Sequence, residues 1–253
     1  MTSTQLRGGT DLHDDVRSAL STVNDPELDE SIVELGFVTS IEVDEGDVRV
    51  RLRLPTYFCS PNFAYLMVSD AHDAVAARPG VRSVSIVLEE HFAADQINAG
   101  VAAGAGFVAS FGDEAAAELD ELRRTFQRKA HTACLERACR RLLASGWTLE
   151  ALSAATVADL PPGWERQSLL RRREDIGLSQ RADAPIFVDD DGRPIPAAQA
   201  PLRLRYAQTV RVSIDGNAHF CRGLLTTRYP HAAADQQPRQ ADPGAPSDSE
   251  ESR

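Results

Sequence analysis

The stretch "FVTSIEVDEGDVRVRLRL", Phe37–Leu54, alternates apolar and polar side chains on both sides of an Asp-Glu-Gly turn signal. Strict alternation is typical of a strand with one buried face, and two such runs around a turn predict a β-hairpin. We therefore expect strands at Phe37–Val43 and Asp47–Leu54.

The segments on either side of this hairpin complete a small domain. Apolar residues three to four apart predict a helix over Asp11–Val23, and Pro61 opens a second amphipathic run that reaches Ala77. Val81–Leu88 has the pattern of a third strand. Residues 11–90 therefore predict the order helix-strand-strand-helix-strand, with the helices covering one face of the sheet.

The rest of the chain has a different character. Residues 91–229 predict a mostly helical extension, so the fold class expected for the whole chain is α+β. Its longest helix is expected at Asp113–Ser145, where Gly146 ends it. Two further helices are expected at Ala197–Ser213 and Asn217–Thr227.

The two ends of the chain are expected to be disordered. Residues 1–10 consist largely of small and polar side chains, and residues 230–253 form a Pro-rich tail that is acidic at its end. Such compositions do not bury enough apolar surface to order themselves.

Composition and charge limit the function. The formal net charge is −11, which argues against nucleic acid as the main partner, since phosphate binding requires a basic face. No window approaches the roughly 18 apolar residues of a membrane span, and the first residues do not resemble a secretory signal. Four cysteines in 253 residues do not form a disulfide framework. We expect a soluble, cytoplasmic protein that binds no membrane.

Cys59 lies in "LPTYFCSPNFAYL", Leu54–Leu66, between the second predicted strand and the second predicted helix. Ser60 is a good N-cap and Pro61 a good first helical residue, so the thiol precedes a helix N-terminus. The helix dipole there favours a thiolate, which is both the nucleophilic and the metal-binding form. From the spacing alone, Cys59 is a packing residue, a nucleophile or a metal ligand.

Three motifs in this order resemble the iron–sulfur assembly domain of SufT and PaaD, which also occurs in the eukaryotic cytosolic iron–sulfur targeting complex. They are "VNDPELDESIVELGFV" at Val23–Val38, Thr56 three residues before Cys59, and "RPGVRSVSIVL" at Arg78–Leu88. The resemblance covers Asp11–Glu90, about a third of the chain. It implies help in building or delivering iron–sulfur clusters for client metalloproteins.

The resemblance also implies which residues act. Cys59 matches the cysteine most tied to activity and is the expected metal ligand, with Asp25, Glu27 and Thr56 in support. Here Ser60 separates the cysteine from the proline that usually follows it directly. The long helical half resembles a longer type found alongside soluble di-iron monooxygenases, which implies an oxygenase client and iron as an alternative cargo.

One cysteine does not hold a cluster alone, because clusters take four thiolate or imidazole ligands. Two protomers meeting at Cys59, or ligands from elsewhere in the chain, would complete the set, so a homodimer is attractive. His131 and Cys134, three residues apart on one helix, share a face, whereas Cys139 is poorly turned for such a pair. The further candidates are His91, His131 and Cys134, while Cys221 is assigned to the core.

We therefore expect a maturation factor without an enzymatic activity of its own, which delivers iron or a cluster to a client. Two alternatives stay open. The first is a metal-free adaptor for an oxygenase component. The second is a thiol enzyme with Cys59 as nucleophile, for which the sequence nominates only His91 or His72 as the base.

Overall fold

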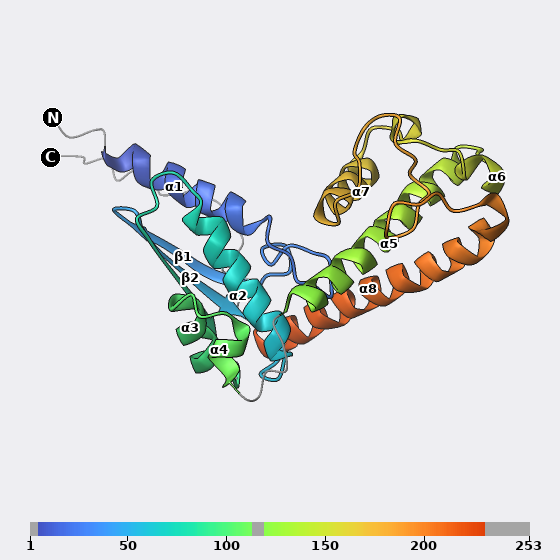
Figure 1. Cartoon of the computed structure of the whole chain (residues 1–253). Coiled ribbons are helices and arrows are strands. Elements are labelled where there is room, and N and C mark those ends of the chain that lie inside the picture. The colour runs from blue at the N-terminus through green and yellow to red at the C-terminus, as the bar shows by residue number, and fades with distance from the viewer. Residues whose placement is uncertain (1–4, 113–118, 231–253) are drawn as a thin grey trace, which may run out of the picture.

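A computed structural model of the chain describes residues 5–112 and 119–230, with side chains from Leu12 onward. Figure 1 shows two parts, a sheet part at one end and a helical part at the other. The elements in chain order are α1 Gln5–Leu20, β1 Val38–Asp44, β2 Asp47–Arg53, α2 Pro61–Ala76, β3 Ser83–Glu89, α3 Ala94–Ala102, α4 Phe107–Phe111, α5 Asp120–Ala144, α6 Leu149–Leu152, α7 Trp164–Asp175 and α8 Ala200–Arg228, with short 3₁₀ turns at Val157–Asp159 and Ala197–Gln199.

The sheet confirms the predicted hairpin and third strand. Its order is β1-β2-β3, with β1 antiparallel to β2 and β2 parallel to β3. Glu45 and Gly46 both have positive φ, 47° and 93°, as a two-residue hairpin turn matched to the twist of its strands requires. A Cβ on Gly46 would also lie 2.7 Å from the Gly80 carbonyl oxygen, so the turn needs glycine for two reasons.

One face of the sheet carries the first core. The alternation predicted for β2 places Val48, Val50 and Leu52 inside, and Ile86 and Leu88 follow in β3. These side chains pack in one cluster with buried residues of α1 and α2. The expected arrangement, helices covering one face of a small sheet, is confirmed.

The helical part has a core of its own. Leu135, Leu142, Leu152, Leu169 and Phe187 are buried together there. Gly146, with φ of 93°, follows the end of α5 as predicted. None of the helices among the described residues is long and apolar enough to cross a lipid bilayer.

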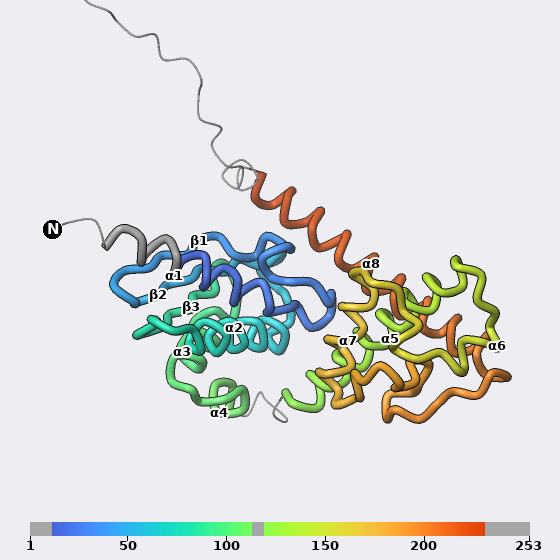
Figure 2. The backbone as a smooth tube through the Cα atoms, turned by 90° about the horizontal axis from the view of Figure 1, so that it is seen from above, coloured from blue at the N-terminus to red at the C-terminus, as the bar shows by residue number. Residues whose placement is uncertain are grey.

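Helix α8 corrects the sequence prediction of two helices at Ala197–Ser213 and Asn217–Thr227. The helix is continuous through Gly216. A single glycine inside a helix lowers its stability by only about 1 kcal/mol relative to alanine, and the apolar side chains that α8 buries outweigh this cost. Its 29 residues span about 43 Å at 1.5 Å per residue. Figures 1 and 2 show α8 running from the helical part back to the sheet part.

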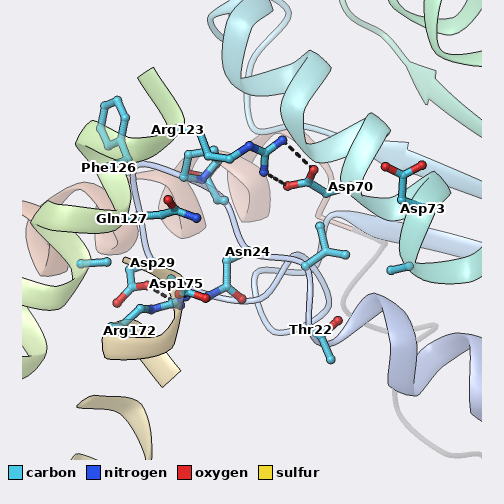
Figure 3. Close-up of a pocket in the computed structure, with 15 residues that line it drawn as sticks. Thr22, Asn24, Asp29, Asp70, Asp73, Arg123, Phe126, Gln127, Arg172 and Asp175 are labelled. Carbon is cyan, nitrogen blue, oxygen red and sulfur yellow. Dashed lines mark hydrogen bonds and ion pairs between the residues drawn. The ribbon is translucent and has the colours of Figure 1, made fainter. Parts of the chain in front are cut away.

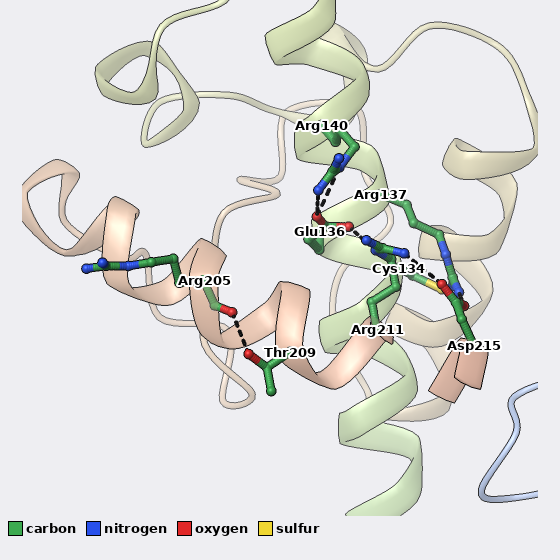
Figure 4. A network of polar contacts seen from close by, with 8 residues as sticks. All are labelled: Cys134, Glu136, Arg137, Arg140, Arg205, Thr209, Arg211 and Asp215. Atoms are coloured by element: carbon green, nitrogen blue, oxygen red, sulfur yellow. Dashed lines mark hydrogen bonds and ion pairs between the residues drawn. The ribbon is translucent and has the colours of Figure 1, made fainter. Parts of the chain in front are cut away.

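Arginine and carboxylate side chains fasten α5 to α8 (Figure 4). The carboxylate of Glu136, almost fully buried, accepts hydrogen bonds from Arg140 at 2.8 Å and from Arg211 of α8 at 2.7 Å. Asp215 is paired with Arg137 at 2.6 Å and with Arg211 at 2.7 Å. Arg203 and Arg211 of α8 therefore pair with carboxylates of the same chain, while Arg205 is exposed.

Some predicted boundaries differ from those observed. Helix α1 begins at Gln5, so residues 5–10, expected within a disordered lead-in, are helical, and it ends at Leu20 rather than Val23. Helix α5 begins at Asp120 rather than Asp113. Residues 1–4, 113–118 and the predicted tail from residue 231 lie outside the described residues.

Candidate functional site

Cys59 lies in the loop that joins β2 to α2, directly before the helix that Pro61 opens. Its side chain is half-buried against the first core. The Thr56 hydroxyl oxygen lies 3.3 Å from the Cys59 sulfur, within hydrogen-bonding distance for a thiol or thiolate. The loop thus presents the thiol next to a hydroxyl group at the start of a 16-residue helix.

The buried His91 side chain is hydrogen-bonded to the backbone of the Cys59 loop. Its Nε2–H donates to the Cys59 carbonyl oxygen at 2.7 Å, and its Nδ1 accepts from the Ala93 amide at 3.2 Å. Burial lowers the pKa of His91, which favours this neutral form. With both ring nitrogens in use, His91 positions the loop and presents no free nitrogen to a metal or to the thiol.

Asp25 and Glu27 lie in the turn that follows α1. Asp25 Oδ1 accepts from the amides of Glu27 at 2.8 Å and Leu28 at 3.0 Å, so this carboxylate shapes the turn. Burial raises the pKa of Asp25 to about 6. Glu27 Oε1 accepts from the Asn217 side chain of α8 at 3.3 Å.

Cys221 of α8 packs against the edge of the first core, in keeping with its assignment to the core from the sequence. Its half-buried side chain packs against the same first core as Cys59. The pKa of Cys221 is raised to about 11, first by burial and then by the negative charges of Asp25, Cys59 and Glu27. Cys221 therefore lies within electrostatic reach of the acidic turn.

His131 and Cys134 of α5 lie elsewhere. Both are buried, and Cys134 belongs to the second core, in the helical part. Burial and the nearby Arg173 and Arg203 lower the pKa of His131 to about 4, and neither ring nitrogen has a hydrogen-bond partner. Burial also raises the pKa of Cys134 to about 12. The structure does not bring this pair to Cys59.

A cavity of about 330 Å³ is lined by the turn that carries Asp25 and by residues of α2, α5 and α7 (Figure 3). Two ion pairs at this cavity cross the seam, the contact between the sheet part and the helical part. Asp70 of α2 accepts two bonds from Arg123 of α5, at 2.5 and 2.8 Å. Arg172 of α7 pairs with Asp29 at 2.5 Å and Asp175 at 2.7 Å. These pairs join the sheet part to the helical part.

Among the residues that the structure describes, no three His, Cys, Asp or Glu side chains are grouped closely enough to hold a metal ion. Iron–sulfur clusters take four protein ligands. The described residues therefore do not form a complete cluster site.

Three exposed aromatic side chains form a cluster at the Cys59 loop. The exposed fractions of Tyr57, Phe58 and Phe92 are 46%, 77% and 49%. Their rings contact one another, with the Tyr57 and Phe58 centroids 5.0 Å apart and those of Phe58 and Phe92 6.1 Å apart. Grouped exposed aromatic side chains mark protein interaction surfaces.

Comparison with known proteins agrees with the family that the sequence motifs predict. The sequence model of the family described as iron–sulfur cluster assembly protein matches residues 13–86, from α1 into β3. An uncharacterized protein of Methanocaldococcus jannaschii, MJ1129, is 37% identical over 86 residues, which are 34% of this chain and 88% of that protein. No solved structure matches the chain. The chain belongs to the iron–sulfur cluster assembly family.

Proposed function

We propose that this chain is a maturation factor that carries iron or an iron–sulfur cluster transiently on Cys59 and passes it to a client metalloprotein. The observation that carries the proposal is the half-buried thiol at the β2–α2 loop of an assembly-family fold, 3.3 Å from the Thr56 hydroxyl. Thiolate ligands suit iron–sulfur chemistry.

An incomplete ligand set suits a carrier better than a storage protein. Because fewer than three protein ligands meet at one place among the described residues, cargo held at Cys59 keeps open coordination positions. A client that presents its own ligands to those positions takes over the cargo. Asp25 and Glu27 support the turn that carries them rather than complete the ligand set, because Asp25 Oδ1 already accepts two backbone amides.

The aromatic cluster of Tyr57, Phe58 and Phe92 gives the client an apolar surface next to the thiol. The client we propose is a metalloenzyme, with a di-iron oxygenase component as the first class to test. The four cysteines are free thiols, which fits work in the reducing cytoplasm. A second copy of this chain, docked through the same surface, is the alternative source of ligands.

Anaerobic purification of wild type and Cys59→Ala, followed by iron, sulfide and absorption measurements, tests the proposal. We expect iron in the wild type and its loss in the variant. Sulfide content then separates a cluster from mononuclear iron. Cys139→Ala, which removes a thiol from the second core, is the matched control and should retain the metal.

Iron bound equally by wild type and Cys59→Ala would overturn the assignment of Cys59. A wild type that binds no iron after reconstitution, yet still binds the client, would establish the metal-free adaptor, which the same aromatic surface serves. Sedimentation of the loaded and empty forms distinguishes a client partner from a homodimer.

The thiol-enzyme alternative requires a base next to the sulfur. His91 uses Nε2 for the Cys59 carbonyl group and Nδ1 for the Ala93 amide. His72 lies on α2 with its Nδ1 3.3 Å from Asp73. Neither histidine nominated from the sequence is placed to take the thiol proton.

A further inference from the structure

The chain leaves β3 through a short connection, residues 90–93, which leads into α3. Its first residue, Glu90, has a φ of 51°, a left-handed conformation that residues with a side chain seldom adopt. Such a conformation persists only where surrounding contacts hold it. The β3–α3 connection therefore depends on contacts with other segments to keep its shape.

On one side, the β3–α3 connection is bonded to the backbone of the Cys59 loop. His91 Nε2–H donates to the Cys59 carbonyl oxygen at 2.7 Å, and the Phe92 amide donates to the Tyr57 carbonyl oxygen at 3.1 Å. The ring of Phe92 also contacts those of His91 and Tyr57, with centroid distances of 4.9 and 6.4 Å. Two carbonyl groups of the loop thus take their donors from this connection.

On the other side, the end of α8 is bonded to Glu90. The Tyr229 hydroxyl donates to the Glu90 carboxylate at 2.7 Å. Arg228 donates to the same carboxylate at 3.2 Å and to the Glu90 backbone carbonyl oxygen at 3.3 Å. Arg53 of β2 lies 3.6 Å from the carboxylate, and its guanidinium lies 4.4 Å from the centroid of the Tyr229 ring. Three side chains from two elements therefore converge on Glu90.

We propose that the end of α8 positions the Cys59 loop through Glu90 and His91, so that the helical extension controls how the thiol is presented. Arg228 and Tyr229 hold Glu90, and His91, the next residue, holds the Cys59 carbonyl group. These four positioning residues lie outside residues 13–86, which match the assembly family. The inference rests on the proposed function for what Cys59 carries, whereas the positioning itself is a property of the metal-free chain.

His91 acts on the carbonyl group of Cys59 and not on its sulfur, so it is a positioning residue. A glutamine side-chain amide can donate from nearly the place of the histidine Nε2–H, whereas leucine fills similar space without a donor. If the hydrogen bond positions the loop, His91→Gln should keep what His91→Leu loses.

Two rates measured on the metal-free full chain test the role of His91. One is hydrogen exchange at the Phe92 amide, whose bond to Tyr57 joins the connection to the loop. The other is maleimide labelling of Cys59, a half-buried thiol that becomes more accessible when its loop is released. We expect His91→Leu to raise both rates by about tenfold, as loss of one hydrogen bond allows, and His91→Gln to stay close to wild type.

Substitutions at the end of α8 test the longer connection. Tyr229→Phe removes one hydroxyl group and should raise both rates by about threefold, because Arg228 still holds Glu90. The double variant Arg228→Gln, Tyr229→Phe should raise them by about tenfold. Tyr206→Phe removes a hydroxyl group from another exposed tyrosine of α8 and is the matched control, which should behave as wild type.

The outcomes separate the two halves of the proposal. Wild-type rates in the double variant, with faster rates in His91→Leu, would overturn the role of α8. Wild-type rates in His91→Leu, or equally fast rates in His91→Gln and His91→Leu, would overturn the role of the His91 hydrogen bond. Far-ultraviolet circular dichroism of each variant shows that a faster rate does not come from global unfolding.

None of these measurements involves metal, so they fail or succeed independently of the proposed function. Iron analysis of Cys59→Ala decides whether Cys59 carries the cargo. Exchange and labelling decide whether the helical extension positions that thiol.

Discussion

The two cores of the molecule treat their thiols in opposite ways. Cys59 and Cys221 are half-buried at the edge of the first core, and exposed aromatic rings lie next to Cys59 in the chain. Cys134 and Cys139 are sealed in α5, where burial raises the pKa of each to about 12. Residue type and spacing alone therefore do not identify a metal ligand; the side chain must also be accessible.

The largest expected effect is a difference in thiol reactivity. In the folded apo chain, Cys59 should react with a maleimide at least about a hundredfold faster than Cys134 or Cys139, because reactivity follows exposure and thiolate fraction. Peptide mass spectrometry after timed labelling measures each rate. In denaturant all four thiols should label alike, and equally fast labelling of Cys134 or Cys139 in the folded chain would contradict the contrast.

The ion pair that joins the two parts should matter to stability. Asp29 and Arg172 are both largely buried and lie 2.5 Å apart. Asp29→Asn should lower the free energy of unfolding by about 2 kcal/mol, because it leaves a buried arginine with fewer partners, although Asp175 still pairs with it. Asparagine tolerates the positive φ of this position, 56°, so the backbone should not change.

Chemical denaturation measures this effect, and Asp183→Asn is the control. Asp183 pairs with Arg181 on the surface, where solvent screens the pair, so this substitution should leave the free energy of unfolding nearly unchanged. If Asp29→Asn is as stable as Asp183→Asn, the seam between the two parts does not depend on this pair.

His131 should make the helical part sensitive to acid. Its pKa is about 4 in the folded chain and near 6.5 when unfolded, so between these values the unfolded chain binds the extra proton. The free energy of unfolding should therefore fall by about 1–3 kcal/mol as the pH drops from 6.5 to 4. Asp25, with its raised pKa, acts in the opposite direction over part of this range.

Comparing the pH dependence of stability between variants separates the effect of His131 from the opposite effect of Asp25. His131→Leu should flatten the loss of stability on acidification, while His72→Gln on the surface of α2 should keep the wild-type profile. Denaturation midpoints from pH 4 to 7 supply the measurement. An unchanged slope in His131→Leu would show that the buried ring does not titrate as described.

The sheet part was largely predictable from the sequence because its signals are local. Alternation over Phe37–Leu54 defines two strands, and Pro61 marks where α2 begins. The place of Cys221 near the acidic turn was missed for a long-range reason. The acidic turn that its helix contacts, through Asn217 and Glu27, lies 190 residues earlier in the chain, and two helices were predicted where α8 is in fact continuous. One periodic signal was present, the apolar face that runs from Ala207 to Leu225.

The smallest effect on stability is expected for an exposed ring of the aromatic cluster, in contrast to a phenylalanine buried in the second core. Phe58→Ser should change the free energy of unfolding by less than about 0.5 kcal/mol, because the ring is 77% exposed. Phe187→Ser, in the second core, should cost at least about 3 kcal/mol.

If the aromatic cluster docks a client, Phe58→Ser should nevertheless weaken binding to an apo-oxygenase component by roughly tenfold or more, as exposed aromatic anchors do. Calorimetry of that binding, alongside denaturation of the same preparation, measures both quantities. Unchanged affinity would remove the aromatic cluster from the docking surface while leaving the role of Cys59 intact, because no ligand of the proposed site is altered.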